Sequence, residues 1–447
     1  MKKTILFIAV AVAVVIGCTN ELMDTSYESV MKEALNKGEH PLVFNAYVGS
    51  GMAQTRATVA SEDLITAASM FSSDPIENNN GNIYALTKCP GVFAYYTGSN
   101  QMNISSGGIF NNSTSGYTAD NDQTYHTYAD YKQTKFLDNV QLQLASSGSP
   151  NFETYLKDGN GYSQKNVYWP TKLIDNSSEY MSFFAYYPHV NTLASDYEES
   201  NLKLIDGGDH GLPALDYEVA TAGDNFPSID LMAAEPIVDQ EISAASSNAI
   251  NLNLKHLLAA VTVHIKWDGP TDVSETPELF FTRAEMLGAK NSGEVTEETM
   301  FRKRGIFSFY TGCWHFSQYF EPLNLLGCTA LTEATMPITL ATSGQHPLFM
   351  HGSSYASEVS DFSDFTTNYA DDNYMLIIPN GNQEALKVNL NYKMKNGSYF
   401  ENVDISKTLD LRIEPGKYYQ ILLKISKTKM TFEVTVDNWA TGSSTNP

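Results

Sequence analysis

Short segments in which apolar and polar residues alternate recur along the whole chain of 447 residues. A two-residue period is that of a β-strand with one buried face, and no long helical pattern lies between these segments. Gly, Asn, Asp and Ser turns separate them at short spacing. We therefore expect an all-β fold built of sandwiches, without alternating strand–helix units. The expected strands are residues 42–48, 92–96, 140–144, 181–187, 261–267, 386–392 and 430–436.

The last of these segments carries a specific expectation about burial. Its apolar side chains alternate with polar ones, and we expect them to line one buried face of the carboxy-terminal domain. They are Met430, Phe432, Val434 and Val436.

The composition agrees with an exported β-rich protein. Hydrophobic residues make up 42% of the chain, which is enough to build cores and excludes global disorder. Charged residues make up only 18%, so long solvent-exposed helices are disfavoured. Asp and Glu total 51 against 28 Lys and Arg, a net charge of -23. This excess argues against nucleic acid as the main partner, because phosphate binding requires clustered cations.

The amino terminus has the pattern of a lipoprotein export signal. A short basic start precedes an apolar run at residues 5–16, which is too short to span a bilayer. The run ends in Gly17 and Cys18, which predicts that Cys18 is acylated and becomes the first residue of the mature chain. The alternative is an ordinary signal peptide with an incidental cysteine. Residues 1–17 are thus the expected signal peptide and residues 18–39 a tether, with attachment by lipid alone.

A small, polar segment at residues 243–248 separates two strand-rich regions. It is the expected boundary between an N-terminal β-sandwich domain, residues 40–242, and a C-terminal one, residues 249–447. Each half has about 200 residues, the upper end for one sandwich.

Three cysteines remain after Cys18, namely Cys89, Cys313 and Cys328. Cys313 and Cys328 could pair across a hairpin, but the sequence does not establish the pair.

Motifs that carry chemistry are absent from the sequence. It has no His-Glu-x-x-His, Gly-x-Ser-x-Gly, P-loop or Cys-x-x-Cys pattern. His256 and His264 lie in strand-like sequence, where we expect hydrogen-bonded, partly buried rings and not metal ligands. Residues 158–161 lack the spaced ligands of a calcium loop and are interpreted as a turn. We therefore expect no catalytic residue, metal or cofactor, although the 51 carboxylates neither support nor refute a glycosidase-like acid pair.

Longer motifs resemble one protein family in their order and spacing. They are Tyr168-Trp169-Pro170, residues 183–188, 230–233, 254–258 and 375–379, Pro415-Gly416-Lys417-Tyr418-Tyr419, and Asn438-Trp439. Together they resemble the fimbrillin-like lipoproteins, the type V pilus subunits of Gram-negative anaerobes. The resemblance runs from Cys18 to Trp439. Each motif also has a simple physical interpretation, since aromatic clusters fill sandwich cores and proline ends strands.

This resemblance implies two tandem transthyretin-like β-sandwich domains with Greek-key-type connections. It implies a structural or adhesive subunit of a cell-surface fimbrium, anchored in the outer membrane by lipid, with other pilus subunits as partners and no catalytic activity. A further partner would be a glycan or protein on a host or bacterial surface.

The family also suggests how such subunits assemble. An extracellular trypsin-like protease cuts its members after a basic residue near the first strand, and Arg56 is the candidate here. The strand then lost would carry Leu42, Phe44, Ala46 and Val48. Losing an edge strand exposes an apolar groove and unpaired backbone groups, which a strand of another subunit can fill. The alternative is that Arg56 is an exposed loop cation in an uncleaved protein.

Stalk, tip and anchor subunits all occur in the family. Residues 440–447 are short and lack alternating apolar residues, so they are a poor donor strand and favour a tip or accessory role over a stalk. A different class of function is a surface glycan-binding lipoprotein, because exposed Tyr and Trp stack on sugars. Core packing explains the same aromatic residues, and it is the interpretation that we prefer. A secreted hydrolase is the third possibility.

Overall fold

The computed structural model describes a large part of the chain. The described residues are 41–48, 89–99, 101–102, 117–118, 134–144, 152–158, 161–170, 178–194, 197, 200–205, 212–219, 229–242, 249–268, 278–309, 311–316, 323–324, 338–339, 346–347, 375–396, 398–426 and 428–438. Over these ranges the fold is built of β-strands, which confirms the all-β prediction. None of these residues belongs to a helix long and apolar enough to cross a membrane.

Within this part of the chain the strands form four sheets. The nine-stranded sheet has the order β1-β12-β10-β7-β2-β4-β5-β6, with β11 beside β7. Its strands are β1 (Phe44–Val48), β2 (Gly91–Gly98), β4 (Thr134–Leu144), β5 (Phe152–Asp158), β6 (Gly161–Gln164), β7 (Tyr180–Tyr187), β10 (Met232–Ala234), β11 (Ile237–Glu241) and β12 (Ile250–His256).

A five-stranded sheet, the middle sheet, lies beside it in the order β3-β16-β15-β9-β8. Its strands are β3 (Tyr117–Thr118), β8 (Leu202–Ile205), β9 (Ala214–Glu218), β15 (Arg304–Ser308) and β16 (Cys313–Phe316).

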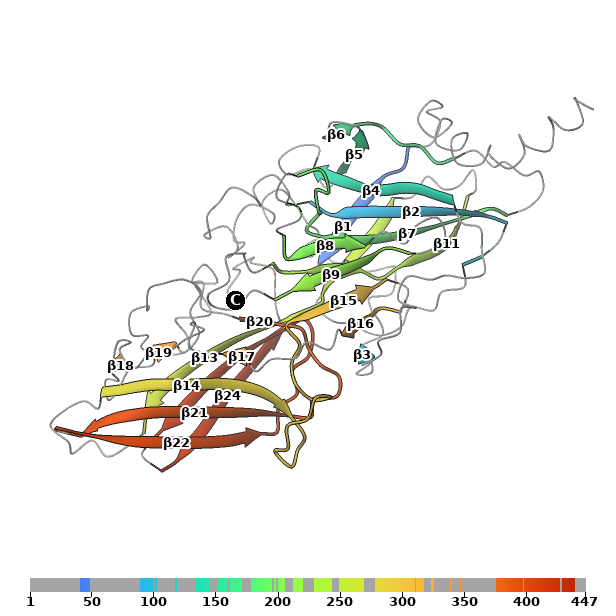
Figure 1. The fold of residues 1–447 in the computed structure, drawn as a ribbon. Coiled ribbons are helices and arrows are strands. Elements are labelled where there is room, and N and C mark those ends of the chain that lie inside the picture. Colours follow the sequence, from blue (N-terminus) through green and yellow to red (C-terminus); the bar gives the residue numbers. More distant parts are fainter. Residues whose placement is uncertain are drawn as a thin grey trace, which may run out of the picture.

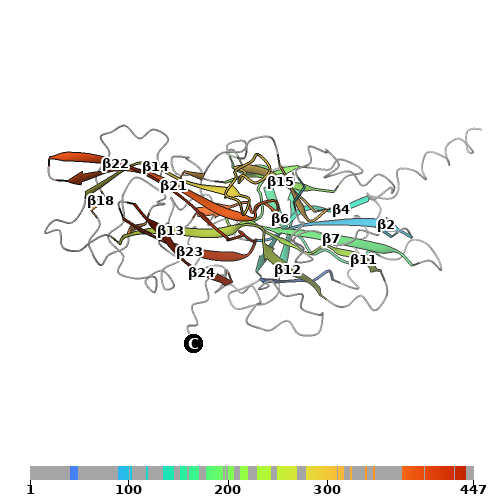
Figure 2. The same ribbon diagram turned by 90° about the horizontal axis from the view of Figure 1, so that it is seen from below.

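Two further five-stranded sheets form the carboxy-terminal sandwich, and their layers face each other in Figures 1 and 2. One has the order β19-β13-β23-β24 with β20 beside β13, and the other has the order β17-β14-β21-β22 with β18 beside β14. The strands are β13 (Ala259–Trp267), β14 (Glu278–Ala289), β17 (Leu323–Asn324), β18 (Ile338–Thr339), β19 (His346–Pro347), β20 (Met375–Ile377), β21 (Ala385–Asn396), β22 (Tyr399–Leu409), β23 (Lys417–Ile425) and β24 (Met430–Asn438).

The central strands of the nine-stranded sheet are buried on both faces, which explains their nearly continuous apolar sequence. On β7, Phe183 and Ala185 face the amino-terminal core, which also contains Phe44, Trp169 and Leu252. The intervening residues face a second core, which we call the middle core because it lies against the middle sheet. The middle core includes Phe93, Tyr95, Phe184, Tyr186, Tyr217, Phe307 and Trp314.

The middle core also connects the nine-stranded sheet to the carboxy-terminal sandwich. Strand β12 ends just before Leu257 and Leu258, and the chain continues directly as β13 of the carboxy-terminal sandwich. Leu257, Leu258 and Tyr418 are all buried in the middle core.

The carboxy-terminal core lies between the two facing sheets of the sandwich. Val263 of β13, Val388 of β21 and Ile421 of β23 are among its buried residues. The alternation that the sequence shows on β13 and β21 thus corresponds to side chains that point into this core.

The sheets take strands from both sides of the expected boundary at residues 243–248, which itself lies outside the described residues. Strand β12 pairs with β1 and β10, and β15 pairs with β9. The division into domains 40–242 and 249–447, like the transthyretin-like topology, therefore stays a prediction about folding units.

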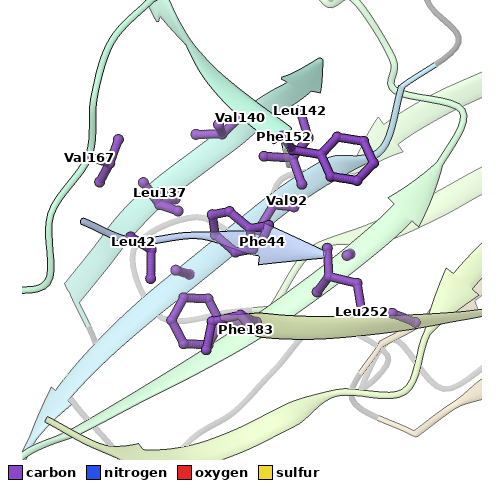
Figure 3. Close-up of a cluster of buried hydrophobic side chains, with 14 of the residues drawn as sticks. Leu42, Phe44, Val92, Leu137, Val140, Leu142, Phe152, Val167, Phe183 and Leu252 are labelled. Carbon is purple, nitrogen blue, oxygen red and sulfur yellow. The ribbon is translucent and has the colours of Figure 1, made fainter. Parts of the chain in front are cut away.

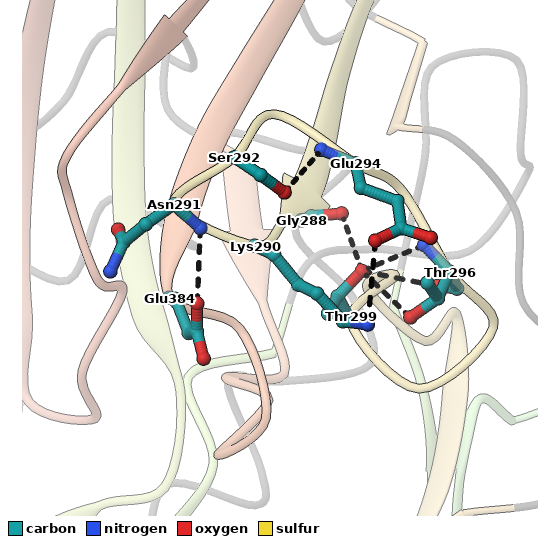
Figure 4. Close-up of polar contacts among 8 residues, drawn as sticks. All are labelled: Gly288, Lys290, Asn291, Ser292, Glu294, Thr296, Thr299 and Glu384. Carbon is teal, nitrogen blue, oxygen red and sulfur yellow. Dashed lines mark hydrogen bonds and ion pairs between the residues drawn. The ribbon is translucent and has the colours of Figure 1, made fainter.

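A loop held by hydrogen bonds and an ion pair connects β14 to β15 and thus the carboxy-terminal sandwich to the middle sheet (Figure 4). The Thr299 hydroxyl donates to the Gly288 carbonyl at 3.1 Å, and the Asn291 amide donates to a Glu384 carboxylate oxygen at 3.0 Å. The Lys290 ammonium nitrogen lies 3.5 Å from a carboxylate oxygen of Glu294, and the two side chains form an ion pair. A Cβ atom at Gly288 would lie 1.9 Å from the Thr299 carbonyl oxygen, so only glycine fits there.

Each of the seven expected strands is present, but the burial expected for β24 was wrong in part. Met430 is buried, Phe432 and Val434 are half-buried, and Val436 is 45% exposed. The reason is the position of β24 at the end of its sheet, where the core covers only part of the strand.

Candidate functional site: the first strand and its surroundings

Strand β1 lies at one end of the nine-stranded sheet, and the residue two positions before it bonds to the chain just beyond β6. It runs parallel to β12, with Phe44 opposite Ile250, and the Ile250 amide donates to the Val43 carbonyl at 2.8 Å. On the other side, the Leu42 amide donates to the Val167 carbonyl at 2.8 Å, just beyond β6. We call β1 and the residues that contact it the β1 site.

Alternate side chains of this strand and of the segment just before it enter the amino-terminal core. Leu42 is 5% exposed, and Phe44 and Ala46 are fully buried. The rings of Phe44 and Phe183 meet edge to face, with centroids 6.0 Å apart. The Asn45 side chain belongs to the opposite, more exposed side and donates to the Asn251 side-chain oxygen at 3.1 Å. The alternation in the sequence therefore corresponds to one buried and one more exposed side.

Phe44 lies in the centre of a cluster that several strands build (Figure 3). The surrounding side chains are Val92 from β2, Leu137, Val140 and Leu142 from β4, Phe152 from β5, Val167, Phe183 from β7 and Leu252 from β12. Trp169 packs edge to face on Phe183 at a centroid distance of 5.7 Å. Of the aromatic residues that the sequence assigned to a core, Trp169 and Phe183 thus lie beside the first strand.

The contacts of β1 are large enough to matter for stability. Full burial of a Leu or Phe side chain contributes about 1.5–3 kcal/mol, and a backbone hydrogen bond about 0.5–1.5 kcal/mol net. Leu42 and Phe44 together therefore contribute a substantial part of the ~5–15 kcal/mol that stabilises a typical protein. Without β1, the edge of β12 would lose its backbone partners and the core would open to water.

A buried polar network braces the strands beside this site. Asn139 of β4 has a φ of 47° and is buried, and its side chain donates to the Val190 carbonyl at 2.9 Å and to the Tyr162 hydroxyl at 3.1 Å. The Tyr186 hydroxyl donates to the Asn139 side-chain oxygen at 2.5 Å. The Nε2 atom of His189 lies 3.2 Å from the Asn139 carbonyl oxygen, and burial lowers the pKa of His189 to about 4.

Two of the predicted site residues, Cys18 and Arg56, lie outside the described residues. Of the predicted strand, Leu42, Phe44 and Ala46 come together in one core, and the backbone of Val48 pairs with β12. The sequence did not identify β12 as the partner of β1, since the paired Asn45 and Asn251 are 206 positions apart. No local signal could have found that partner.

The remaining candidates occupy structural positions. His256 and His264 are both buried, and the Nδ1 atom of His256 lies 2.9 Å from an Asp230 carboxylate oxygen. Cys313 is a free, buried thiol that donates to the Thr311 carbonyl at 3.3 Å, and burial raises its pKa. Its proposed partner, Cys328, lies outside the described residues.

Residues 158 and 161, the two ends of the predicted turn, pair with each other at the β5–β6 connection, and the two residues between them lie outside the described residues. Among the residues that the structure describes, no group of three or more His, Cys, Asp or Glu side chains could hold a metal ion.

Comparisons with known proteins identify the family of this chain. A fimbrial protein from Bacteroides vulgatus is 16% identical, with 89% of this chain and 99% of that chain covered and a TM-score of 0.46. The tip fimbrial protein Mfa3 from Porphyromonas gingivalis, with a C-terminal truncation, is 9% identical, with 90% and 99% covered and a TM-score of 0.27. No curated protein matches the chain. The fimbrillin-like family model matches residues 114–439, well over half of the chain, and the protein therefore belongs to the fimbrillin-like family.

Proposed function

We propose that this protein is a pilus or adhesion subunit that assembles by strand exchange at the β1 site. The observation that carries the proposal is the position of β1, at the end of a sheet with its alternate side chains inside the core. A strand from another subunit with a similar pattern of side chains would restore both the core and the lost backbone hydrogen bonds. The family membership supports the pilus or adhesion role.

We propose further that cleavage after Arg56 releases β1 and separates the protein from its lipid at Cys18. Before cleavage the subunit would be a surface-exposed lipoprotein of the outer membrane, and afterwards part of a fimbrium. Within such a fimbrium we propose a tip or accessory role for this subunit.

The mass of the protein recovered from cell surfaces tests cleavage. We expect a species that begins after Arg56, and an Arg56→Gln variant that keeps residues 18–56 and forms no fibres. Lys157→Gln is the matched control, since Lys157 is an exposed cation on β5 and should leave the mass unchanged apart from the substitution itself. Wild-type protein that retains the first strand within assembled fibres would contradict the proposal.

Glycan binding is the alternative function, and the end of the β21–β22 hairpin favours it. Tyr399 is 79% exposed and Phe400 is 56% exposed, an unusual exposure for large apolar side chains. Exposed aromatic rings offer faces on which sugars can stack. A glycan array should then show binding that Tyr399→Ala abolishes, whereas binding to no glycan would remove this alternative.

A further inference from the structure

We propose that the β1 site selects incoming strands by side-chain size, in the order aliphatic, aromatic, small at alternate positions. This inference rests on the proposed strand exchange and specifies the chemistry of the partner. Leu42, Phe44 and Ala46 show the order, because the three side chains differ in size and each is buried. The occupant is a strand of another polypeptide with this pattern.

The aromatic position is the most demanding of the three. Phe44 is fully buried and packs edge to face on Phe183, which in turn packs on Trp169. A smaller side chain would leave a cavity and lose the aromatic contact. An incoming strand with alanine at this position would therefore bind far more weakly.

The small position excludes large side chains. Ala46 is fully buried and lies opposite Leu252 of β12. The same core contains Ala94 and Ala185, which are also fully buried. A phenylalanine at position 46 would have to displace packed atoms, and close-packed interiors resist such changes.

The strands that line the site also pack against a second core on the opposite face of the sheet. Strands β2 and β7 contribute Val92 and Phe183 to the amino-terminal core, while Phe93 and Phe184 are buried in the middle core. The described residues of the middle core include none from β1. The walls should therefore keep their positions when β1 leaves, so that a poorly fitting strand gains little from their relaxation.

The order of sizes also selects the direction of the strand. Strand β1 is parallel to β12, and the backbone of Leu42 bonds to Val167 at the other end of the sheet. A strand inserted in the opposite direction would place its small residue where Leu42 lies and its aliphatic residue where Ala46 lies. Size selection and the hydrogen bond to Val167 thus favour one orientation.

Peptide exchange into the nicked full-length chain tests this proposal. A specific protease site introduced between residues 49 and 56 allows the chain to be cut, and the cut does not depend on cleavage at Arg56. The probe is a labelled peptide of residues 41–48 with lysines added for solubility. The test peptide exchanges two side chains, Phe44→Ala with Ala46→Phe, at constant composition. The control peptide carries Asn45→Ser, on the more exposed side.

We expect the native and control peptides to enter the site with similar affinity, and the exchanged peptide to bind at least about 100-fold more weakly. Equal binding of all three peptides would overturn size selection while leaving strand exchange intact. Failure of every peptide to enter, with the original strand retained, would overturn strand exchange as well. Should the nicked chain unfold, the same two substitutions in the intact chain must lower its urea midpoint more than Asn45→Ser does, or the proposal fails.

Discussion

Phe44→Ala in the intact chain measures directly how much the first strand contributes to the folded state. Phe44 is fully buried, so the substitution removes most of a ring from a closed core. Such substitutions cost about 3–5 kcal/mol. The loss of the edge-to-face contact with Phe183 is part of that cost. Against a total of ~5–15 kcal/mol, we expect a large decrease in the urea midpoint.

The same variant shows whether β1 opens separately from the rest of the protein. If it does, the global midpoint stays constant and the amides that bond across the strand exchange faster with solvent. The reporters are the amide of Leu42, which bonds to Val167, and the amide of Ile250, which bonds to Val43. A loss of about 3 kcal/mol corresponds to roughly 100-fold faster exchange.

Asn45→Ala is the control for both measurements, because its side chain lies on the more exposed side of the strand. We expect this change to cost less than about 1 kcal/mol. The reasoning would be refuted if Phe44→Ala changed neither the urea midpoint nor the exchange of the two reporter amides. In that case, β1 would not be part of the folded core.

Three further predictions concern other parts of the molecule. The pKa of His189 is about 4 in the folded state, below the usual value of 6.5, so folding favours the neutral ring. The full contribution of His189 to the free energy of unfolding should therefore be present above pH 6.5, and about 3 kcal/mol of it should be lost as the pH falls towards 4. Urea unfolding of His189→Gln at the same pH values should lack this loss. Gly288→Ala should cost at least about 1–3 kcal/mol in thermal unfolding, because its Cβ would overlap a loop carbonyl, whereas Ser292→Ala nearby should change little. Met430→Ala should cost about 2–5 kcal/mol in urea unfolding and Val436→Ala less than about 0.5 kcal/mol, so equal costs would contradict the observed burial.

The sequence predicted those strands whose side-chain pattern follows directly from burial. The apolar run on β7 and the alternation on β13 each correspond to an observed strand. Alternation does not specify which strands pair, and for that reason the parallel pairing of β1 with β12 was not predictable. The exposure of Val436 escaped prediction for a related reason, since it depends on the position of β24 at the end of a sheet.

The polar network around Asn139 could not have been predicted either. An asparagine tolerates a positive φ better than most residues, but this tolerance does not indicate burial or partners. Its contacts with Tyr162, Tyr186 and Val190 bring together residues from three separate parts of the chain. Only the folded arrangement of β4, β6 and β7 places these groups within hydrogen-bond distance.

The two cores on opposite faces of one sheet explain how the proposed exchange would be physically possible. A sheet packed on one side only would lose its main support together with its first strand, and its exposed apolar face would collapse or aggregate. Here β2 and β7 keep a second buried face, through Phe93 and Phe184, in a core whose described residues include none from β1. The free energy that holds the sheet in place is thus divided between a core that contains β1 and one that does not. A vacant site of fixed shape is the condition under which side-chain size can discriminate between incoming strands, because rigid walls prevent a poor fit from being relieved.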